Sequence, residues 1–200
     1  MATPKSQRIG IWVIAVVLFI GTVGSFAVMV LANENNKSDL NQQNKLLEEY
    51  QKQQEEKQKQ ADADAAKLSL KYYSKFSKYQ DDPAAFDASK VGDKVVRRDL
   101  TTGGGAEIKD DTTYKAYYVG WNPKGVVFDS SFDGKKLKAP FDTGMFSPIK
   151  GWEQGVVGMR VGGVREITIP SDLAYGETGQ GNNIPPNTPI KFIVMVIAVN

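Results

Sequence analysis

The sequence predicts an α+β domain that follows a membrane-spanning segment, and three features lead to this prediction. From residue 91 onward, short β-type segments alternate with glycine-rich turns. One segment among them, 148–159, has Trp152, Val156 and Met159 at helical spacing. Residues 9–32 carry no charged side chain. One short helix among many strands is typical of the α+β class.

The N-terminal segment is expected to span a membrane. Residues 9–32 form 24 consecutive uncharged positions, enough at helical rise to cross a hydrocarbon core of about 30 Å. Lys5 and Arg8 precede it, so the positive-inside tendency places residues 1–8 in the cytoplasm and the rest outside. A signal peptide cleaved after Ala32 is the alternative, but its apolar region would usually be only about 7–15 residues long. We therefore expect a single-pass protein of the cytoplasmic membrane.

Residues 33–82 change character and predict a stalk. The segment is rich in Gln, Lys, Glu and Ala, which favours a solvated helix or a disordered linker. Residues 51–66 contain no large apolar side chain, which argues against a stable coiled coil. The aromatic residues near its end are expected to dock onto the next domain. Asp82-Pro83 then ends the helix, so we place the domain boundary between Pro83 and Val91 and assign 83–200 to the folded domain.

The expected strands are short. They are residues 95–100, 113–119, 126–128, 163–169 and 190–199, with a glycine turn at 102–105.

Composition excludes several kinds of chemistry. The chain has no cysteine and no histidine, so disulfides, thiol nucleophiles and imidazole acid–base catalysis are absent. With 25 basic and 23 acidic residues the net charge is only +2, which does not favour a nucleic-acid partner. We expect no cofactor and no metal.

Four sequence signatures occur in order along the last 110 residues or so. They are Tyr-Tyr-Val-Gly at 117–120, Val-Phe-Asp-Ser-Ser at 127–131, Ile-Lys-Gly-Trp-Glu-Gln-Gly-Val at 149–156, and Asp-Leu-Ala-Tyr-Gly at 172–176 followed by Ile-Pro-Pro-Asn-Thr at 184–188. In these residues the chain resembles FKBP-type peptidyl-prolyl cis-trans isomerases, in a membrane-anchored bacterial form. The resemblance implies an antiparallel sheet wrapped around one short helix, with a hydrophobic pocket between them.

The resemblance also implies roles for individual residues. Trp152 would form the pocket floor, the Tyr175 hydroxyl and the Ile149 N–H would donate to carbonyls of the bound peptide, and Asp129 would lie near the reacting imide. The residues assigned to the catalytic pocket are Tyr118, Phe128, Asp129, Ile149, Trp152 and Tyr175. Those assigned to substrate contact are Phe141, Ile184, Phe192 and Gln180, the last standing where well-studied members carry histidine. Plain core packing for Phe141 and Phe192, and a turn-capping role for Asp129, stay open.

The implied reaction suits a chain without histidine or cysteine. Rotation about an X-Pro bond faces a barrier near 18–20 kcal/mol from amide resonance and needs neither proton transfer nor a covalent intermediate. The expected partners are proline-containing polypeptides, the lipid bilayer through residues 9–32, and macrolides of the tacrolimus and rapamycin type. The expected activity is isomerisation of X-Pro bonds in extracytoplasmic polypeptides.

Two departures from the family pattern keep alternatives open. Residues 140–149 are about two positions shorter than in familiar members, and no arginine occurs in 132–136. A non-catalytic proline-peptide binding module or an anchored chaperone is therefore a second hypothesis, and assembly through the stalk is a third. No long insertion interrupts the pocket segments, so the flap of chaperone-like relatives is missing.

Overall fold

The computed structural model describes residues 37–200, with side chains from residue 42. The expected cytoplasmic segment 1–8 and membrane span 9–32 lie outside the described residues. Among the described helices, none combines the length and apolar character that crossing a bilayer requires. The stalk was expected to be a solvated helix or a disordered linker, and residues Lys37–Phe76 form helix α2. The chain divides into two units, Met1–Glu56 and Lys57–Asn200, of which the second contains every strand among the described residues.

The second unit is built on one antiparallel sheet. Within the described residues the sheet has six strands in the order β1-β7-β8-β2-β3, and β6 also pairs with β2. Its strands are β1 (Val96–Thr101), β2 (Tyr114–Trp121), β3 (Val127–Ser130), β6 (Phe141–Asp142), β7 (Val164–Ile169) and β8 (Ile190–Val199). A separate hairpin joins β4 (Phe132–Asp133) to β5 (Lys136–Leu137), and short 3₁₀ helices occupy Ser77–Tyr79, Ala88–Lys90 and Ser171–Leu173. The antiparallel sheet around one short helix agrees with the fold class expected from the sequence.

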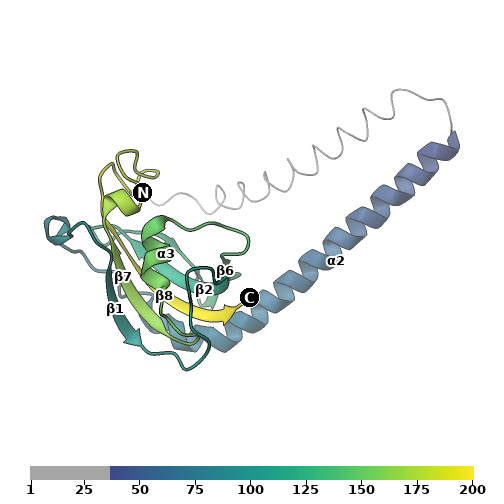
Figure 1. Ribbon diagram of the computed structural model, residues 1–200. Helices are drawn as coiled ribbons and strands as arrows, with labels where there is room; N and C mark the ends of the chain where they lie inside the picture. Colours follow the sequence, from purple (N-terminus) through teal and green to yellow (C-terminus); the bar gives the residue numbers. More distant parts are fainter. Residues whose placement is uncertain (1–36) are drawn as a thin grey trace. The chain divides into compact units, whose positions relative to one another are not determined.

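Helix α3 (Lys150–Val156) lies against one face of this sheet (Figure 1). It is shorter than the expected segment 148–159, because Ile149 is extended at its N-cap and Val157 leaves the helical region at its end. Glycines allow the close approach: a Cβ on Gly151 would lie 2.2 Å from Ile169 Cγ2, and one on Gly155 would lie 2.5 Å from Ile167 Cγ2. The glycines at i and i+4 therefore form the helix surface that meets β7.

Strand β2 contributes side chains to two cores, because successive strand residues point to opposite faces. Tyr114 and Ala116 are buried with Trp152 on the α3 side, and Tyr118 packs against the same cluster. Tyr117 and the residues that alternate with it belong to the cluster on the other face. Burial on both faces explains why β2 and β8 are apolar along nearly their whole length.

The end of α2 covers the other face of the sheet. Phe76 is 0% exposed and stacks on Phe132, with ring centroids 5.2 Å apart. The Tyr72 hydroxyl donates to the carbonyl of Ile197 at 3.2 Å, and the hydroxyl of Ser69 accepts from the N–H of Leu137 at 2.8 Å. The aromatic residues at the end of the stalk were expected to dock onto the domain, and they lie in its core within the unit that begins at Lys57. The domain boundary between Pro83 and Val91 stays a prediction.

Residues 83–87, which we call the strap, lie in the segment that connects α2 to β1. The Trp121 indole N–H donates to the carbonyl of Ala84 at 3.0 Å, and Phe86 N–H donates to the carbonyl of Pro123 at 2.9 Å. Lys191 lies 5.1 Å from the Phe86 ring centroid, a cation–π geometry. The strap is thus fixed to the sheet by backbone and aromatic contacts.

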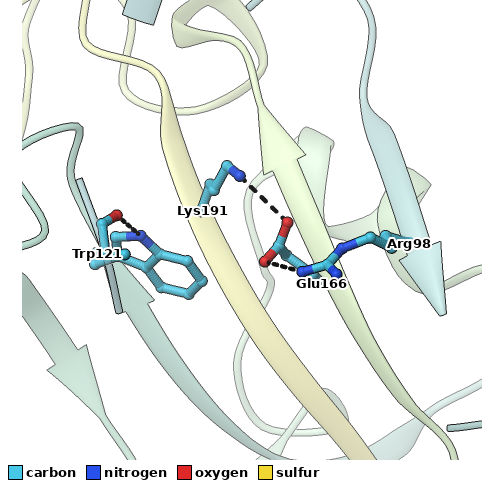
Figure 2. A network of polar contacts seen from close by, with 5 residues as sticks. Arg98, Trp121, Glu166 and Lys191 are labelled. Carbon is cyan, nitrogen blue, oxygen red and sulfur yellow. Dashed lines mark hydrogen bonds and ion pairs between the residues drawn. The ribbon is translucent and has the colours of Figure 1, made fainter. Parts of the chain in front are cut away.

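An ion-pair network lies beside the strap on the sheet. Figure 2 shows Glu166 between Arg98 and Lys191, with N···O distances of 2.9 Å and 3.2 Å. Burial alone would raise the pKa of Glu166, but the hydrogen bond from Arg98 and the charge of Lys191 outweigh it, so this pKa lies below its ordinary value. The three side chains link β1, β7 and β8.

Candidate functional site

An aromatic cluster lies between α3 and the sheet, with Trp152 at its centre. The ring centroid of Trp152 is 4.8 Å from Phe192, 5.4 Å from Tyr118 and 5.7 Å from Phe141, all in edge-on geometry. Phe128 meets Phe192 edge-on at 5.5 Å. The structure therefore brings together, from β2, β3, β6, β8 and α3, the aromatic residues that the sequence assigned to one pocket. Phe192 is buried in the core as well, so packing and pocket roles coexist there.

The indole of Trp152 is fixed by a hydrogen bond that the sequence did not predict. Trp152 is 4% exposed, and its Nε1–H donates to the Tyr114 hydroxyl oxygen at 2.8 Å. Burial, with a smaller contribution from the charge of Glu153, raises the pKa of Tyr114 to about 12. Tyr114 is thus a neutral phenol at physiological pH, and its hydroxyl oxygen fixes the position of the Trp152 indole.

The Asp129 carboxylate accepts two hydrogen bonds beside the aromatic residues. Its Oδ2 accepts from the Tyr118 hydroxyl at 2.6 Å, and its Oδ1 accepts from the N–H of Ser130 at 2.8 Å. Ser131 fixes Tyr118 further, because its hydroxyl accepts from Tyr118 N–H at 2.9 Å and its own N–H donates to the Tyr118 carbonyl at 2.8 Å. Asp129 therefore shapes the local turn and also orients the Tyr118 ring.

Two hydrogen-bond donors remain available near the pocket. Tyr175 is half-buried and packs against the same core cluster. Burial raises the pKa of its hydroxyl, and the negative charge of Asp129 raises it further, so the O–H stays protonated. In the described part of the chain, neither this O–H nor the N–H of Ile149 has a hydrogen-bond acceptor. Both donors are free to bind a peptide carbonyl.

Ile184 and Gln180 are held together by the loop that follows Tyr175. Gln180 N–H donates to the carbonyl of Ile184 at 2.7 Å, and Ile184 N–H donates back at 3.3 Å. The Asn122 side chain donates to the carbonyl of Asn183 at 2.7 Å and ties the loop to the end of β2. Ile184 is buried in the pocket cluster, whereas Gln180 is exposed and contributes its backbone. A contact between the Gln180 side chain and substrate stays a prediction.

Three further residues belong to the site although sequence reasoning missed them. Tyr114 is one, and its period-two spacing with Ala116 and Tyr118 was the signal that could have placed it on the Trp152 face. Phe146 stacks on Phe141 at 6.2 Å and extends the aromatic wall outward. Lys138 donates to the carbonyl of Ser130 at 2.7 Å, so a lysine outside 132–136 supports β3 next to Asp129.

The fold and the cluster define a class of protein: an α+β domain in which aromatic rings gather between one short helix and an antiparallel sheet, with the Tyr175 hydroxyl and the Ile149 N–H beside them. Comparison with known proteins agrees. The sequence profile of the family described as FKBP-type peptidyl-prolyl cis-trans isomerase matches residues 104–197.

The FK506-binding protein of Neisseria meningitidis serogroup A is 37% identical over 105 residues, covering 52% of this chain and 95% of that protein. FK506-binding protein 2 of Yarrowia lipolytica is 40% identical over 89 residues, covering 44% of this chain and 60% of that protein. The crystal structure of a peptidyl-prolyl cis-trans isomerase from Pseudomonas syringae pv. tomato aligns with 69% of this chain and 95% of its own, at 28% identity and a TM-score of 0.46.

This chain therefore belongs to the FKBP-type peptidyl-prolyl cis-trans isomerase family. The reaction of the family, interconversion of cis and trans X-Pro bonds, is the activity expected from the sequence.

Proposed function

We propose that this chain accelerates X-Pro isomerisation in polypeptides outside the cytoplasmic membrane, with the pocket around Trp152 as its site and residues 9–32 as its anchor. The observation that carries the proposal is the combination of an aromatic floor and walls with two unused donors, Tyr175 O–H and Ile149 N–H. An aromatic enclosure accepts the pyrrolidine ring, and the donors fix the peptide on either side of it.

The pocket favours the twisted amide by physical means alone. Resonance in the planar amide separates charge between oxygen and nitrogen, and twisting the C–N bond reduces this separation. A pocket of aromatic rings solvates the planar form less well than water does, so it lowers the difference in free energy between planar and twisted forms. The donors hold the flanking carbonyls while the bond rotates. No side chain of this site needs to take or give a proton.

The extracytoplasmic location rests on the sequence pattern. An uncharged stretch at 9–32 after Lys5 and Arg8 supports an uncleaved anchor with the C-terminal domain outside. Uncatalysed X-Pro isomerisation takes tens to hundreds of seconds, which is slow enough to limit the rate of folding. Proteins that fold outside the membrane with X-Pro bonds in the wrong isomer are therefore suitable substrates. We expect FK506-type macrolides to compete for the same pocket, as the names of the relatives suggest.

The activity is tested with the full chain in detergent micelles. The cis-to-trans rate of an Ala-Leu-Pro-Phe peptide is compared between the parent protein and the variants Tyr175→Phe and Trp152→Leu. We expect the parent to accelerate the reaction and both variants to lose much of this acceleration. Peptide binding without acceleration by the folded parent would instead identify an anchored binding module.

The topology has a separate test that uses the absence of cysteine from the sequence. Single cysteines are introduced at Ser6 and at Asn200, and intact cells are treated with a membrane-impermeant thiol reagent. Labelling at position 200 but not at position 6 supports the proposed orientation. Labelling at neither position, with the protein present, contradicts it.

A further inference from the structure

A cavity separate from the aromatic cluster is lined by Tyr114, the residue that accepts the Trp152 N–H. Its volume is about 400 Å³, within the range of ligand sites in proteins. We call it the rear groove. It is lined by residues 109–113, by Thr143, Ser147 and Pro148 of the loop 143–148, and by the side of α3 that carries Glu153. The aromatic residues Tyr118, Phe128 and Phe192 do not line it, so it is distinct from the proline pocket.

The rear groove combines an apolar base with an acidic rim. Ile108 and Val156, both buried, form apolar lining, while Asp110, Asp111 and Glu153 stand exposed around it. Lys109 is the one basic side chain of the lining. In the part of the chain that the structure describes, none of the three carboxylates forms an ion pair with lysine or arginine, and no group of acidic side chains is arranged to hold a metal ion. This charge balance favours an organic cation with an aliphatic stem, which is the chemistry of a lysine or arginine side chain.

Tyr114 provides a second, independent feature. Its side chain is 4% exposed and lines the groove, and its hydroxyl accepts the Trp152 N–H. Tyr114 therefore connects the groove to the aromatic residues around Trp152.

The loop 143–148 contributes residues both to the groove and to the aromatic cluster around Trp152. Phe146 stacks on Phe141, which contacts Trp152 on the pocket side. Ser147 and Pro148 line the groove. A polypeptide leaving the proline pocket across this loop would therefore enter the groove.

We propose that the rear groove is a second substrate-binding site, which takes a lysine- or arginine-containing segment of the same polypeptide whose proline occupies the aromatic pocket. The proposal rests on the proposed function. The acidic rim binds the basic side chain, and the apolar base contacts its stem. The site would select clients that carry basic residues near the proline.

The test compares peptides on the full chain in detergent micelles. One substrate is Ala-Leu-Pro-Phe, and others add a Gly-Ser spacer of two to six residues followed by Lys-Leu-Lys or Glu-Leu-Glu at either end. Exposed ion pairs are individually weak, so two or three of them together are expected to lower KM about threefold or more for the best-spaced basic tail. The triple variant Asp110→Asn, Asp111→Asn, Glu153→Gln should lose this gain and keep its rate on Ala-Leu-Pro-Phe.

A matched control distinguishes the effect of charges in the groove from the effect of the protein's net charge. Asp81→Asn, Asp82→Asn and Asp93→Asn together change the charge equally at exposed positions away from the groove. The control should retain the gain from the basic tail. Equal KM values for basic and acidic tails, or equal loss of the gain in the control, would overturn the proposal.

A binding measurement keeps the groove testable if the isomerase activity itself fails. The proline-free peptide acetyl-Lys-Leu-Lys-amide is titrated into the protein while the indole N–H resonance of Trp152 is followed by NMR. A saturable shift in the parent that the triple variant loses supports the groove, and no shift up to millimolar peptide excludes it.

Discussion

Replacing Tyr114 by phenylalanine tests how the pocket floor is held. The change removes one hydroxyl and leaves the ring in place, so it creates almost no cavity. It removes the acceptor of the buried Trp152 N–H, whose N···O distance is 2.8 Å. An unsatisfied buried donor costs about 1–3 kcal/mol, so we expect the free energy of unfolding to fall by that amount.

The same strand supplies a matched control. Tyr117 is fully buried on the opposite face of β2, and in the described residues its hydroxyl has no hydrogen-bond partner. Tyr117→Phe therefore removes a desolvated polar group without breaking a contact, and stability should stay unchanged or rise by about 1 kcal/mol. Two identical chemical changes, three residues apart, should have different effects.

The assay is urea unfolding of the full chain, with the isomerisation rate and the Trp152 indole N–H resonance measured on the same samples. Tyr114→Phe should move that resonance and lower kcat/KM about two- to tenfold, because the floor is less well positioned. Tyr117→Phe should change neither. The reasoning would be refuted if the two variants had equal stability and the indole resonance stayed in place in both.

Three further predictions concern stability. Phe76→Ala should lower the free energy of unfolding in urea by about 3–5 kcal/mol, because the ring is fully buried against the sheet. Leu70→Ala, at an 84% exposed position, should change it by no more than about 0.5 kcal/mol. Similar losses in the two variants would mean that the end of the helix is not part of the core. Gly151→Ala should lower the thermal midpoint, because the new Cβ would meet Ile169 at 2.2 Å, and a midpoint equal to that of Gly104→Ala, where nothing lies within 4 Å, would contradict this. The lowered pKa of Glu166 stabilises the fold fully above the ordinary glutamate value of 4.5, and this contribution is lost as pH falls through the lower folded-state pKa. Glu166→Gln should therefore weaken the dependence of stability on acid, and an unchanged acid profile would argue against the ion pairs of Figure 2.

The strongly apolar strands could be predicted from sequence. The segment 190–199 coincides with β8, because its side chains are buried on both faces and the apolar run is continuous. Strands β4, β5 and β6 have two residues each, too few for a period-two pattern to appear. The boundary at Pro83 followed a local helix-ending signal, whereas the core extends to Phe76 because of contacts distant in sequence.

The site divides in the same way. The aromatic residues were assigned through the resemblance to the family, Tyr118, Phe128 and Trp152 from within the signatures, and the structure brings them together with Phe141 and Phe192. The contact from Trp152 to Tyr114 depends on which residue of β2 lies opposite a helix 38 positions later. Periodicity selects the correct face of β2, but only the packed fold selects the partner.

The position of β8 in the sheet has a consequence for how the chain acquires its structure. The two halves of the sheet, β1-β7 and β2-β3, are joined only through β8 in the described order, and β8 follows every other strand in the sequence. Pairing across the sheet therefore waits until residues 190–199 have been synthesised and released from the ribosome. Until then the chain lacks the strand that joins the two halves of the sheet, and a premature stop before Ile190 would yield two half-sheets with no strand to connect them.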